Sequence, residues 1–193
     1  MADDERRRHA VSVLRASAAV HEAAAAACAD HIVAAATLVR AALTAGGQVL
    51  VFGNGGSAAD AQHFVAELVG RFEAGHTRRA LPALALSSDP SVVTALGNDL
   101  GFEQVFARQV EAFGRPGDVA IGITTSGTSA NVVTAMRVAR DRGLRVVALT
   151  GRAAGQTMPA DVHVAVPEDR TARVQEVHMT LLHILCELVE EGL

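Results

Sequence analysis

The sequence has very few aromatic residues. It contains no tryptophan, no tyrosine and six phenylalanines, so that aromatic residues make up 3% of its 193 residues. The sequence therefore offers few aromatic rings on which the bases of single-stranded nucleic acid could stack. Positive charge does not compensate, because the formal net charge is −4. This composition argues against nucleic acid as a partner.

Cysteine is equally scarce. Cys28 and Cys186 are the only two cysteines, and their positions match no metal-binding or redox spacing. Both stand in apolar, helical surroundings, so we expect buried free thiols in a reducing, cytoplasmic environment. The charged start of the chain, MADDERRRHA, is followed by no short apolar core with a cleavage site, so we expect no export signal.

Uninterrupted apolar runs long enough to cross a membrane are missing as well. The most alanine-rich stretch, 23–45, is interrupted by Asp30, His31 and Arg40. A membrane-spanning helix needs about 20 predominantly apolar residues in a row. We therefore expect a soluble protein without a membrane partner.

The length predicts a single domain, 1–193, in which N-terminal helices (1–45) precede an α/β core (46–193). The N-terminal part is rich in alanine and poor in helix breakers, which predicts two helices that part near Ala29 and Asp30. Because alanine buries little surface, these helices are expected to pack on the domain itself or on another subunit.

In the core, short apolar runs alternate with helical segments and turns. We expect strands at 49–52, 81–86, 119–123, 145–150 and 161–166. We expect helices at 57–71, 102–113, 130–142 and 171–191, a linker at 73–79, a turn and helix start at 87–90 and a break at 97–99. This alternation predicts an α/β fold, a doubly wound five-stranded parallel sheet flanked by helices. In such sheets ligands bind at the carboxyl edge of the strands.

Two loops at that edge have the composition of anion-binding loops. The first strand leads into GNGGS at 53–57, in which missing side chains let backbone N–H groups approach a ligand, and Ser57 is placed to cap the next helix. The third strand leads into TTSGTS at 124–129, whose hydroxyl groups stand beside another helix start. Neither loop is a nucleotide-type glycine motif or a P-loop. Two such loops on one sheet favour a phosphate ligand over ordinary helix capping.

Two helices carry polar pairs whose role the spacing leaves open. His63 and Glu67 are four residues apart, on one face of the helix after the glycine loop. Gln175 and His183 lie about two turns apart on the last helix. Either stripe is also typical of a solvated helix face, and on spacing alone that interpretation is the better one for His63 and Glu67. Composition and spacing thus lead to an α/β protein that binds a sugar phosphate or nucleotide phosphate, and no further.

The motifs together resemble those of the sugar isomerase (SIS) domain family and, within it, the phosphoheptose isomerases. The segments that carry the resemblance are GNGGSAADAQHFVAELVGRF at 53–72, GND at 97–99, GITTSGTSAN at 122–131 and VQEVHMTLLHILCELVE at 174–190. The similarity extends over nearly the whole chain. It implies a SIS fold, a sugar-phosphate substrate and a homotetramer with active sites at subunit interfaces.

The resemblance also implies site residues. One zinc ion per subunit would be held by His63, Glu67, Gln175 and His183, a set compatible with the nitrogen and oxygen ligands that zinc accepts. Glu67 and His183 would form the catalytic acid/base pair. Sugar-phosphate contacts would be made by Asn54, Gly55, Gly56, Glu67, Asn98, Asp99, Thr124, Thr125, Ser126, Ser129 and Gln175.

One position departs from the family's pattern. Some of these isomerases carry an aspartate three residues before the glutamine of the last helix, where this chain has Ala172. The role of that aspartate would be absent here or filled by another residue such as Asp169.

The reaction implied is the conversion of the ketose D-sedoheptulose 7-phosphate to the aldose D-glycero-D-manno-heptose 7-phosphate. A base takes a proton from C1, the enediolate oxygens are stabilised and a proton returns at C2. Zinc would polarise the carbonyl and hold the enediolate. A carboxylate bound to a metal is a poor base, so Glu67 would be both ligand and base only by shifting between these roles. Gln175 exchanges no protons at neutral pH and would orient the substrate or ligate.

Two functions without turnover stay open at this point. Some SIS-domain relatives are tetrameric regulators that bind a replication initiator and have replaced the metal and acid/base residues. Glu67 and His183 are both present here, which favours the enzyme over such a regulator. A sugar-phosphate sensor would keep both loops and lack turnover, so a test of isomerisation separates it from the enzyme.

Overall fold

The protein is built around a five-stranded sheet. The computed structural model describes residues 3–73, 75, 78–154 and 158–191. All neighbouring strands pair in parallel, in the order β2-β1-β3-β4-β5. The strands are β1 (Val49–Gly53), β2 (Ala83–Ala85), β3 (Val119–Thr124), β4 (Arg145–Gly151) and β5 (Val162–Val166). The α/β fold with a five-stranded parallel sheet, expected from the sequence, is confirmed.

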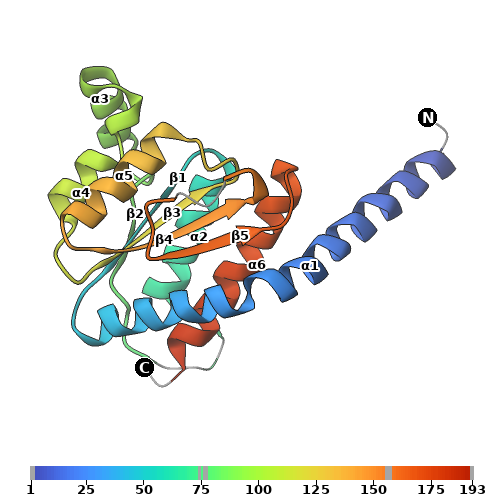
Figure 1. Ribbon diagram of the computed structural model, residues 1–193, viewed down its shortest axis with the longest axis horizontal. Coiled ribbons are helices and arrows are strands. Elements are labelled where there is room, and N and C mark those ends of the chain that lie inside the picture. Colours follow the sequence, from blue (N-terminus) through green and yellow to red (C-terminus); the bar gives the residue numbers. More distant parts are fainter. Residues whose placement is uncertain (1–2, 74, 76–77, 155–157, 192–193) are drawn as a thin grey trace.

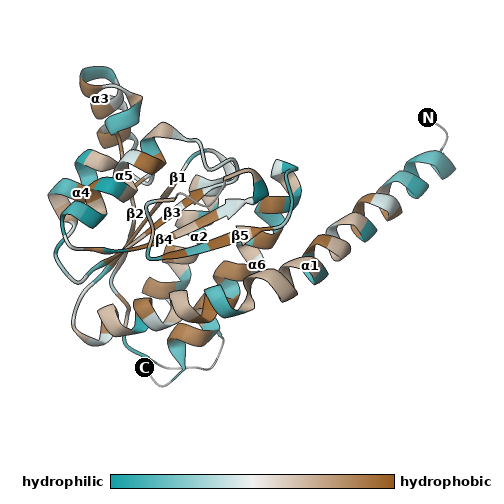
Figure 2. Ribbon diagram, in the orientation of Figure 1, coloured by the Kyte–Doolittle hydropathy of each residue, from teal (hydrophilic) through white to brown (hydrophobic). Residues whose placement is uncertain are grey.

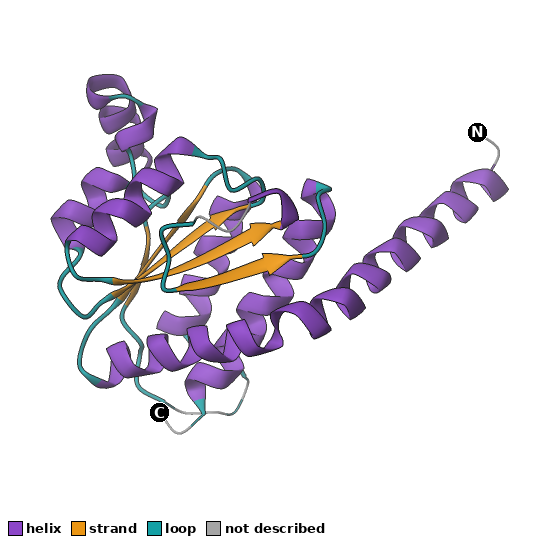
Figure 3. Cartoon of the chain, viewed as in Figure 1, coloured by secondary structure: helices purple, strands orange, loops and turns teal. Residues whose placement is uncertain are grey.

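Helices cover both faces of the sheet, as Figures 1 and 3 show. One face carries α1 (Asp3–Thr44), α2 (Gly56–Val69) and α6 (Thr171–Glu190). The other carries α4 (Ala107–Phe113) and α5 (Ala130–Asp141). The remaining pieces are α3 (Pro90–Leu100), which begins after the helix-capping Asp89, and the short 3₁₀ turns η1 (Phe102–Gln104) and η2 (Arg152–Ala154).

Successive strand residues fill two separate cores. In β1, Val49 and Val51 pack beneath α1, α2 and α6, whereas Leu50 and Phe52 pack beneath α4 and α5. Every residue of β1 and β3 is buried. A parallel strand buried on both faces reads as a continuous apolar run, which is why these strands could be predicted. Figure 2 shows the strands predominantly in the hydrophobic colour.

The N-terminal region is one helix of 42 residues, so the expected break between two helices is wrong. Ala29 and Asp30 lie on the exposed side of α1, where an aspartate contacts solvent without interrupting the backbone hydrogen bonds. Burial in α1 begins at Ala24. The part before it is mostly exposed and projects beyond the body of the molecule (Figure 1).

Among the described residues, α1 alone is long and apolar enough, by length and composition, to cross a membrane. Its C-terminal half, however, packs on β5 and α6. The side chains buried there are Ala24, Cys28, Ile32, Ala35, Ala36, Val39, Ala42 and Leu43. Core packing therefore accounts for part of the apolar stretch, and the absence of a membrane partner stays a prediction.

The ends of α2 differ from expectation. α2 begins at Gly56, so Ser57 lies inside its first turn, buried and without a capping hydrogen bond, and the expected cap is wrong. Gly55 precedes the helix with a φ of 55°, a backbone conformation that glycine adopts without strain. The helix ends at Val69 rather than near 71.

Two further boundaries were predicted wrongly. The GND segment at 97–99 does not break the chain, because α3 runs through it to Leu100; η1 and α4 then replace the single helix expected at 102–113. β2 is shorter than 81–86, because Pro82 has no N–H and the N–H of Leu81 donates to the Leu68 carbonyl of α2. Residues 74, 76 and 77 of the expected linker lie outside the described residues.

Cys28 and Cys186 are buried free thiols, as expected. Burial raises the pKa of both thiols, that of Cys186 to about 12. Neither is poised to react at neutral pH, so the chemistry of the protein has to come from other side chains.

Candidate active site

A cavity of about 300 Å³ opens at the carboxyl edge of β1 and β3, beside the N-terminus of α6. Its lining residues are Asn54, Gly55, Gly56, Ser57, Ile123, Thr124, Thr125, Ser129, Thr171 and Gln175. Both predicted loops thus meet at one place. Small residues, hydroxyl groups and the starts of α2 and α6 surround it, which is suitable for a phosphate group. We call this cavity the cradle.

Side-chain hydrogen bonds hold the two loops of the cradle together. The amides of Asn54 and Asn131 exchange two hydrogen bonds of 2.8 Å each. Asn131 is almost fully buried in the first turn of α5. Because each amide donates once and accepts once, the pair fixes the glycine loop against the hydroxyl loop.

The hydroxyl loop is ordered by its own side chains. The hydroxyl oxygens of Thr124 and Ser129 are 3.0 Å apart, and Ser129 precedes α5 without capping it, so its hydroxyl remains directed to the cradle. Ser126, in contrast, is exposed, lies 2.9 Å from the Thr128 hydroxyl and does not line the cavity. The structure therefore brings Thr124 and Ser129 to the cradle but not Ser126.

Asn98 and Asp99 also stand apart from the cradle. Both are exposed near the end of α3, and the Asn98 amide donates to the Asp99 carboxylate at 2.7 Å. In the described chain α3 has no buried residue, and it projects from the body (Figure 1). A contact of these two residues with substrate stays a prediction.

The polar stripes of α2 and α6 face each other. The Nε2 atoms of His63 and His183 are 3.0 Å apart, and Nε2 of His63 is 3.5 Å from a carboxylate oxygen of Glu67. The His183 ring also lies against Phe72, with 5.4 Å between ring centroids. Two residues 120 positions apart in the sequence thus lie side by side, although the His63 side chain is still 44% exposed.

A half-buried carboxyl group stands next to this cluster. Asp60 lies one helix turn before His63, and burial raises the pKa of its carboxyl group, whereas the nearby His63 lowers it. Its Oδ2 atom is buried and has no hydrogen-bond partner among the described residues. A carboxylate with one desolvated oxygen atom favours positive charge nearby, so Asp60 is suited to a cation beside it.

The donor atoms can be compared with the needs of zinc. Within the described residues no three His, Cys, Asp or Glu side chains are closed around a metal position. Zn–N bonds of about 2.0–2.1 Å nevertheless place tetrahedral ligand atoms about 3.3–3.4 Å apart. The separations from His63 to His183 and to Glu67, 3.0 and 3.5 Å, are close to that value. The donor types and these two separations suit zinc, and the zinc site itself stays a prediction.

Gln175 lies at the cradle, at the start of α2. A methyl group built on Gly56 would lie 2.9 Å from the Gln175 side-chain carbonyl carbon, so the amide lies directly over the start of α2. Gln175 is on the same helix as His183. The fourth ligand implied by the resemblance therefore lines the cradle.

Some lining residues were missed from the sequence. Thr171 begins α6 one turn before Gln175, and a hydroxyl at a helix start was a signal that could have found it. Ser57 was assigned to capping, although its side chain lies in the cavity wall. Asp169, named as a substitute for the missing aspartate, instead pairs with Arg152 at 3.7 Å.

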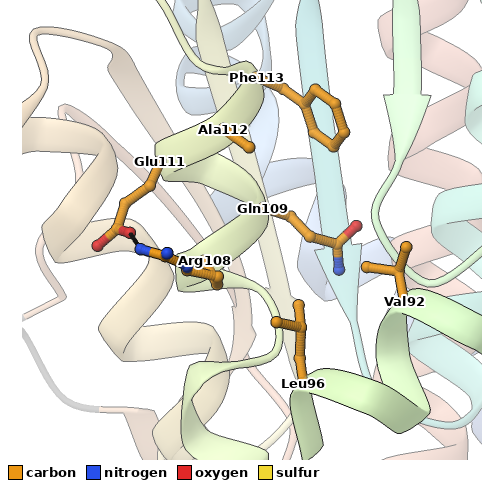
Figure 4. Close-up of a pocket in the computed structure, with 7 residues that line it drawn as sticks. All are labelled: Val92, Leu96, Arg108, Gln109, Glu111, Ala112 and Phe113. Atoms are coloured by element: carbon orange, nitrogen blue, oxygen red, sulfur yellow. Dashed lines mark hydrogen bonds and ion pairs between the residues drawn. The ribbon is translucent and has the colours of Figure 1, made fainter. Parts of the chain in front are cut away.

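A second cavity, of about 380 Å³, lies between α3 and α4 (Figure 4). Its polar side chains are already engaged: Arg108 pairs with Glu111 at 2.7 Å, and the Gln109 amide donates to the carbonyls of Leu86 and Val105. Val92, Leu96, Ala112 and Phe113 complete the lining. Although this cavity is of similar size, it presents no converging phosphate-binding groups.

Comparisons with known proteins identify the family of the chain. A model of the SIS domain matches residues 14–151. A phosphoheptose isomerase of Bordetella avium is 55% identical over 157 residues, which cover 79% of this chain and 79% of that protein. The chain belongs to the phosphoheptose isomerase family.

Solved structures of phosphoheptose isomerases share the fold along the whole chain. The structure from Neisseria gonorrhoeae has 42% identity and a TM-score of 0.88, covering 96% of this chain and 98% of that one. The structure from Francisella tularensis has 36% identity and a TM-score of 0.90, and each chain is covered completely. The SIS fold with its long N-terminal helix is therefore confirmed.

Proposed function

We propose that this protein is an aldose–ketose isomerase that converts D-sedoheptulose 7-phosphate to D-glycero-D-manno-heptose 7-phosphate. The observation that carries the proposal is the convergence of His63, Glu67 and His183 on two helices that both start at the cradle. Relatives that are more than half identical bear the name phosphoheptose isomerase. A phosphate-binding end and a proton-transferring end are what this reaction requires.

The spacing of the two ends suits a seven-carbon sugar phosphate. His63 lies seven residues after Gly56 on α2, an axial rise of roughly 10 Å. This is comparable with the length of an extended seven-carbon chain. With the 7-phosphate in the cradle, bound by Thr124, Ser129 and the start of α2, C1 and C2 reach the imidazole and carboxylate groups.

Glu67 and His183 divide the proton transfers. One of these two side chains takes the proton from C1. The electron pair of the broken C–H bond forms the C1–C2 double bond, and the C2 oxygen gains negative charge. The other moves the hydroxyl proton from O1 to O2. The first returns the proton to C2 as the C1 aldehyde forms, so that no atom or electron is gained or lost. Gln175, which stays neutral, orients the sugar between the two ends.

We infer that one zinc ion per subunit completes the site, held by His63, Glu67, Gln175 and His183. When bound, it supplies a Lewis acid that polarises the substrate carbonyl. The half-buried carboxyl group of Asp60, whose Oδ2 atom has no partner among the described residues, supports a cation at this position.

We infer a homotetramer in the cytoplasm. An apolar groove of about 450 Å³ runs between α1 and α6, and Leu14 and Val33 of α1 are 70% and 53% exposed. Contiguous apolar surface of this kind supports burial against another subunit. Light scattering on the eluting protein measures the mass; a monomer at assay concentration would refute the tetramer.

The test is a coupled assay with sedoheptulose 7-phosphate, with and without chelator, on the wild type and His183→Ala. We expect turnover in the wild type and its loss, by at least about 100-fold, in the variant. Loss on chelation and recovery with zinc support the metal. His9→Ala, on the exposed start of α1, is the control and keeps wild-type turnover. Folded wild type without turnover would refute the isomerase and favour a sensor or a regulator.

A further inference from the structure

α2 and α6 lie side by side and run in the same direction, in contact at three levels. At their N-terminal ends the Gln175 amide lies over Gly56. In the middle, His63 meets His183. At their C-terminal ends the two helices are joined by Arg78, from the segment between α2 and β2. The proposed chemistry takes place at the middle level, so its geometry depends on how both ends are held.

The Arg78 guanidinium makes four hydrogen bonds and one close ion pair. Nε donates to a carboxylate oxygen of Glu190 at 2.6 Å, and Nη2 lies 2.5 Å from the same oxygen. Nη1 donates to the carbonyls of Leu68 and Arg79, at 2.9 and 3.0 Å, and Nη2 also donates to the carbonyl of Glu67 at 2.7 Å. All three nitrogens of the guanidinium donate, in a planar arrangement that a lysine with three donors on one nitrogen cannot reproduce.

These contacts pair with carbonyls in the last turn of α2 and with an acidic side chain at the end of α6. Carbonyls in the last turn of a helix have no partner within the helix, and a positive charge there is favourable. Glu190, the last residue of α6, is a negative charge at the unfavourable end, which Arg78 neutralises. The side chains of Arg78 and Glu190 are only 5% and 8% exposed. Buried ion pairs of this kind add little net stability compared with apolar residues, so a role in fixing geometry explains this one better.

Arg78 and Glu190 together, which we call the clamp, are connected to the acid/base pair in two ways. One route is direct, because Arg78 binds the backbone carbonyl of Glu67 itself. The other passes through Glu190, which accepts a hydrogen bond from the N–H of Phe72 at 3.1 Å. The Phe72 ring in turn lies against the His183 ring. The clamp therefore contacts the backbone of Glu67 directly and the ring of His183 through Phe72.

We propose that Arg78, with Glu190, is a positioning residue that sets the register of α2 against α6 and thereby the placement of Glu67 relative to His183. The kinetic part of this inference rests on the proposed isomerase function; the geometric part does not. Arg78 touches no reacting atom, so its effect is expected in turnover rather than in binding at the cradle.

The kinetic test compares Arg78→Met, Arg78→Lys and Glu190→Gln with the wild type. A misplacement of about 1 Å in an acid/base pair can cost roughly 100-fold in rate, so we expect Arg78→Met to lower kcat roughly 10- to 100-fold. KM should change less than about threefold, because the cradle is untouched. Arg78→Lys keeps the charge and recovers part of kcat. Arg108→Met, which breaks the exposed pair with Glu111, is the matched control and leaves kcat unchanged.

A second readout does not depend on turnover. In the metal-free protein with ¹⁵N-labelled histidine, Arg78→Met should shift the imidazole signals of His63 and His183 and leave those of His163 and His178 unchanged. If the wild type isomerises nothing, the proposed function fails while this comparison still tests the clamp. Unchanged His63 and His183 signals, or a kcat that falls only with the folded fraction, would overturn the inference. Should Arg78→Met not fold, the same readouts on Glu190→Gln decide, because that variant keeps the shape and the carbonyl bonds of Arg78.

Discussion

The two ends of the proposed site are built from different kinds of structure. The cradle consists mainly of backbone and short side chains in two loops, each contiguous in the sequence, with Thr171 and Gln175 added from the start of α6. The acid/base end consists of long side chains on two helices, and its members His63 and His183 are 120 residues apart. The backbone N–H groups of the glycines and the hydroxyl groups can bind a ligand from their positions within one loop. An imidazole on one helix acts only when a second helix holds its partner at the right distance.

This difference predicts two classes of kinetic effect. Substitutions in the cradle should weaken binding and appear mainly in KM. Substitutions at the acid/base end, or in the contacts that align α2 with α6, should appear mainly in kcat. Each of the following experiments tests whether the two ends can be separated in this way.

The largest effect is expected for Glu67→Gln. The substitution keeps the size of the side chain and removes its ability to exchange a proton, so kcat should fall roughly 10²- to 10⁴-fold with little change in KM. Steady-state kinetics measure both. Glu187→Gln, on the exposed side of α6, is the matched control and should behave as the wild type. A Glu67→Gln enzyme with normal kcat and a raised KM would assign Glu67 to substrate binding and remove the distinction between the ends.

A smaller effect, on the pH dependence of stability, is expected for the part of α6 between the cradle and the acid/base end. His178 lies on α6 between Gln175 and His183, is fully buried, and its Nε2 donates to the Thr150 carbonyl at 3.1 Å. Burial lowers its pKa to about 4, so the imidazole is neutral in the folded protein. Between pH 6.5 and 4 the unfolded chain therefore binds a proton that the folded chain does not. Stability from this residue is complete above pH 6.5 and is lost as the pH falls toward 4, by roughly 3 kcal/mol in total.

Urea unfolding at pH 7 and pH 5 measures this loss. The wild type should lose roughly 2 kcal/mol more than His178→Asn over that interval, because asparagine does not titrate. His9→Asn, at an exposed position of α1, should keep the full pH dependence. Equal pH dependence in the wild type and His178→Asn would show that His178 is accessible to protons in the folded protein and that α6 is not tightly packed at this position.

The same contrast explains what could be predicted from the sequence. The cradle was predictable because a glycine or hydroxyl loop between a strand and a helix start is a local pattern, and parallel strands bring such loops to one edge. The spacing of His63 and Glu67 shows which face of α2 they share, but not what that face meets. Only the resemblance to the family paired them with His183. The Arg78 clamp has no sequence pattern, because its partners are backbone carbonyls and a residue 112 positions away.

The errors have physical reasons of the same kind. Helix propensity predicted the helical N-terminal region correctly, but whether Asp30 breaks it depends on its exposure, which propensity does not contain. The GND segment contains residues that favour turns, yet α3 continues through it. Asn98 and Asp99 therefore stand on an exposed helix rather than in a loop at the cradle.

The smallest effect tests the one contact that joins the two ends. In Gly56→Ala the new methyl group would overlap the Gln175 amide, the far end of a flexible side chain, so the amide turns away while the backbone stays. Stability should change by less than about 1 kcal/mol, since alanine suits a helix start at least as well as glycine. KM should rise roughly tenfold, equivalent to about 1.4 kcal/mol. A double-mutant cycle with Gln175→Ala separates the causes: if Gly56→Ala acts through Gln175, it has no further effect once that amide is gone. An equal rise in KM in both backgrounds would instead mean that the methyl group blocks the phosphate directly, and that the cradle works independently of α6.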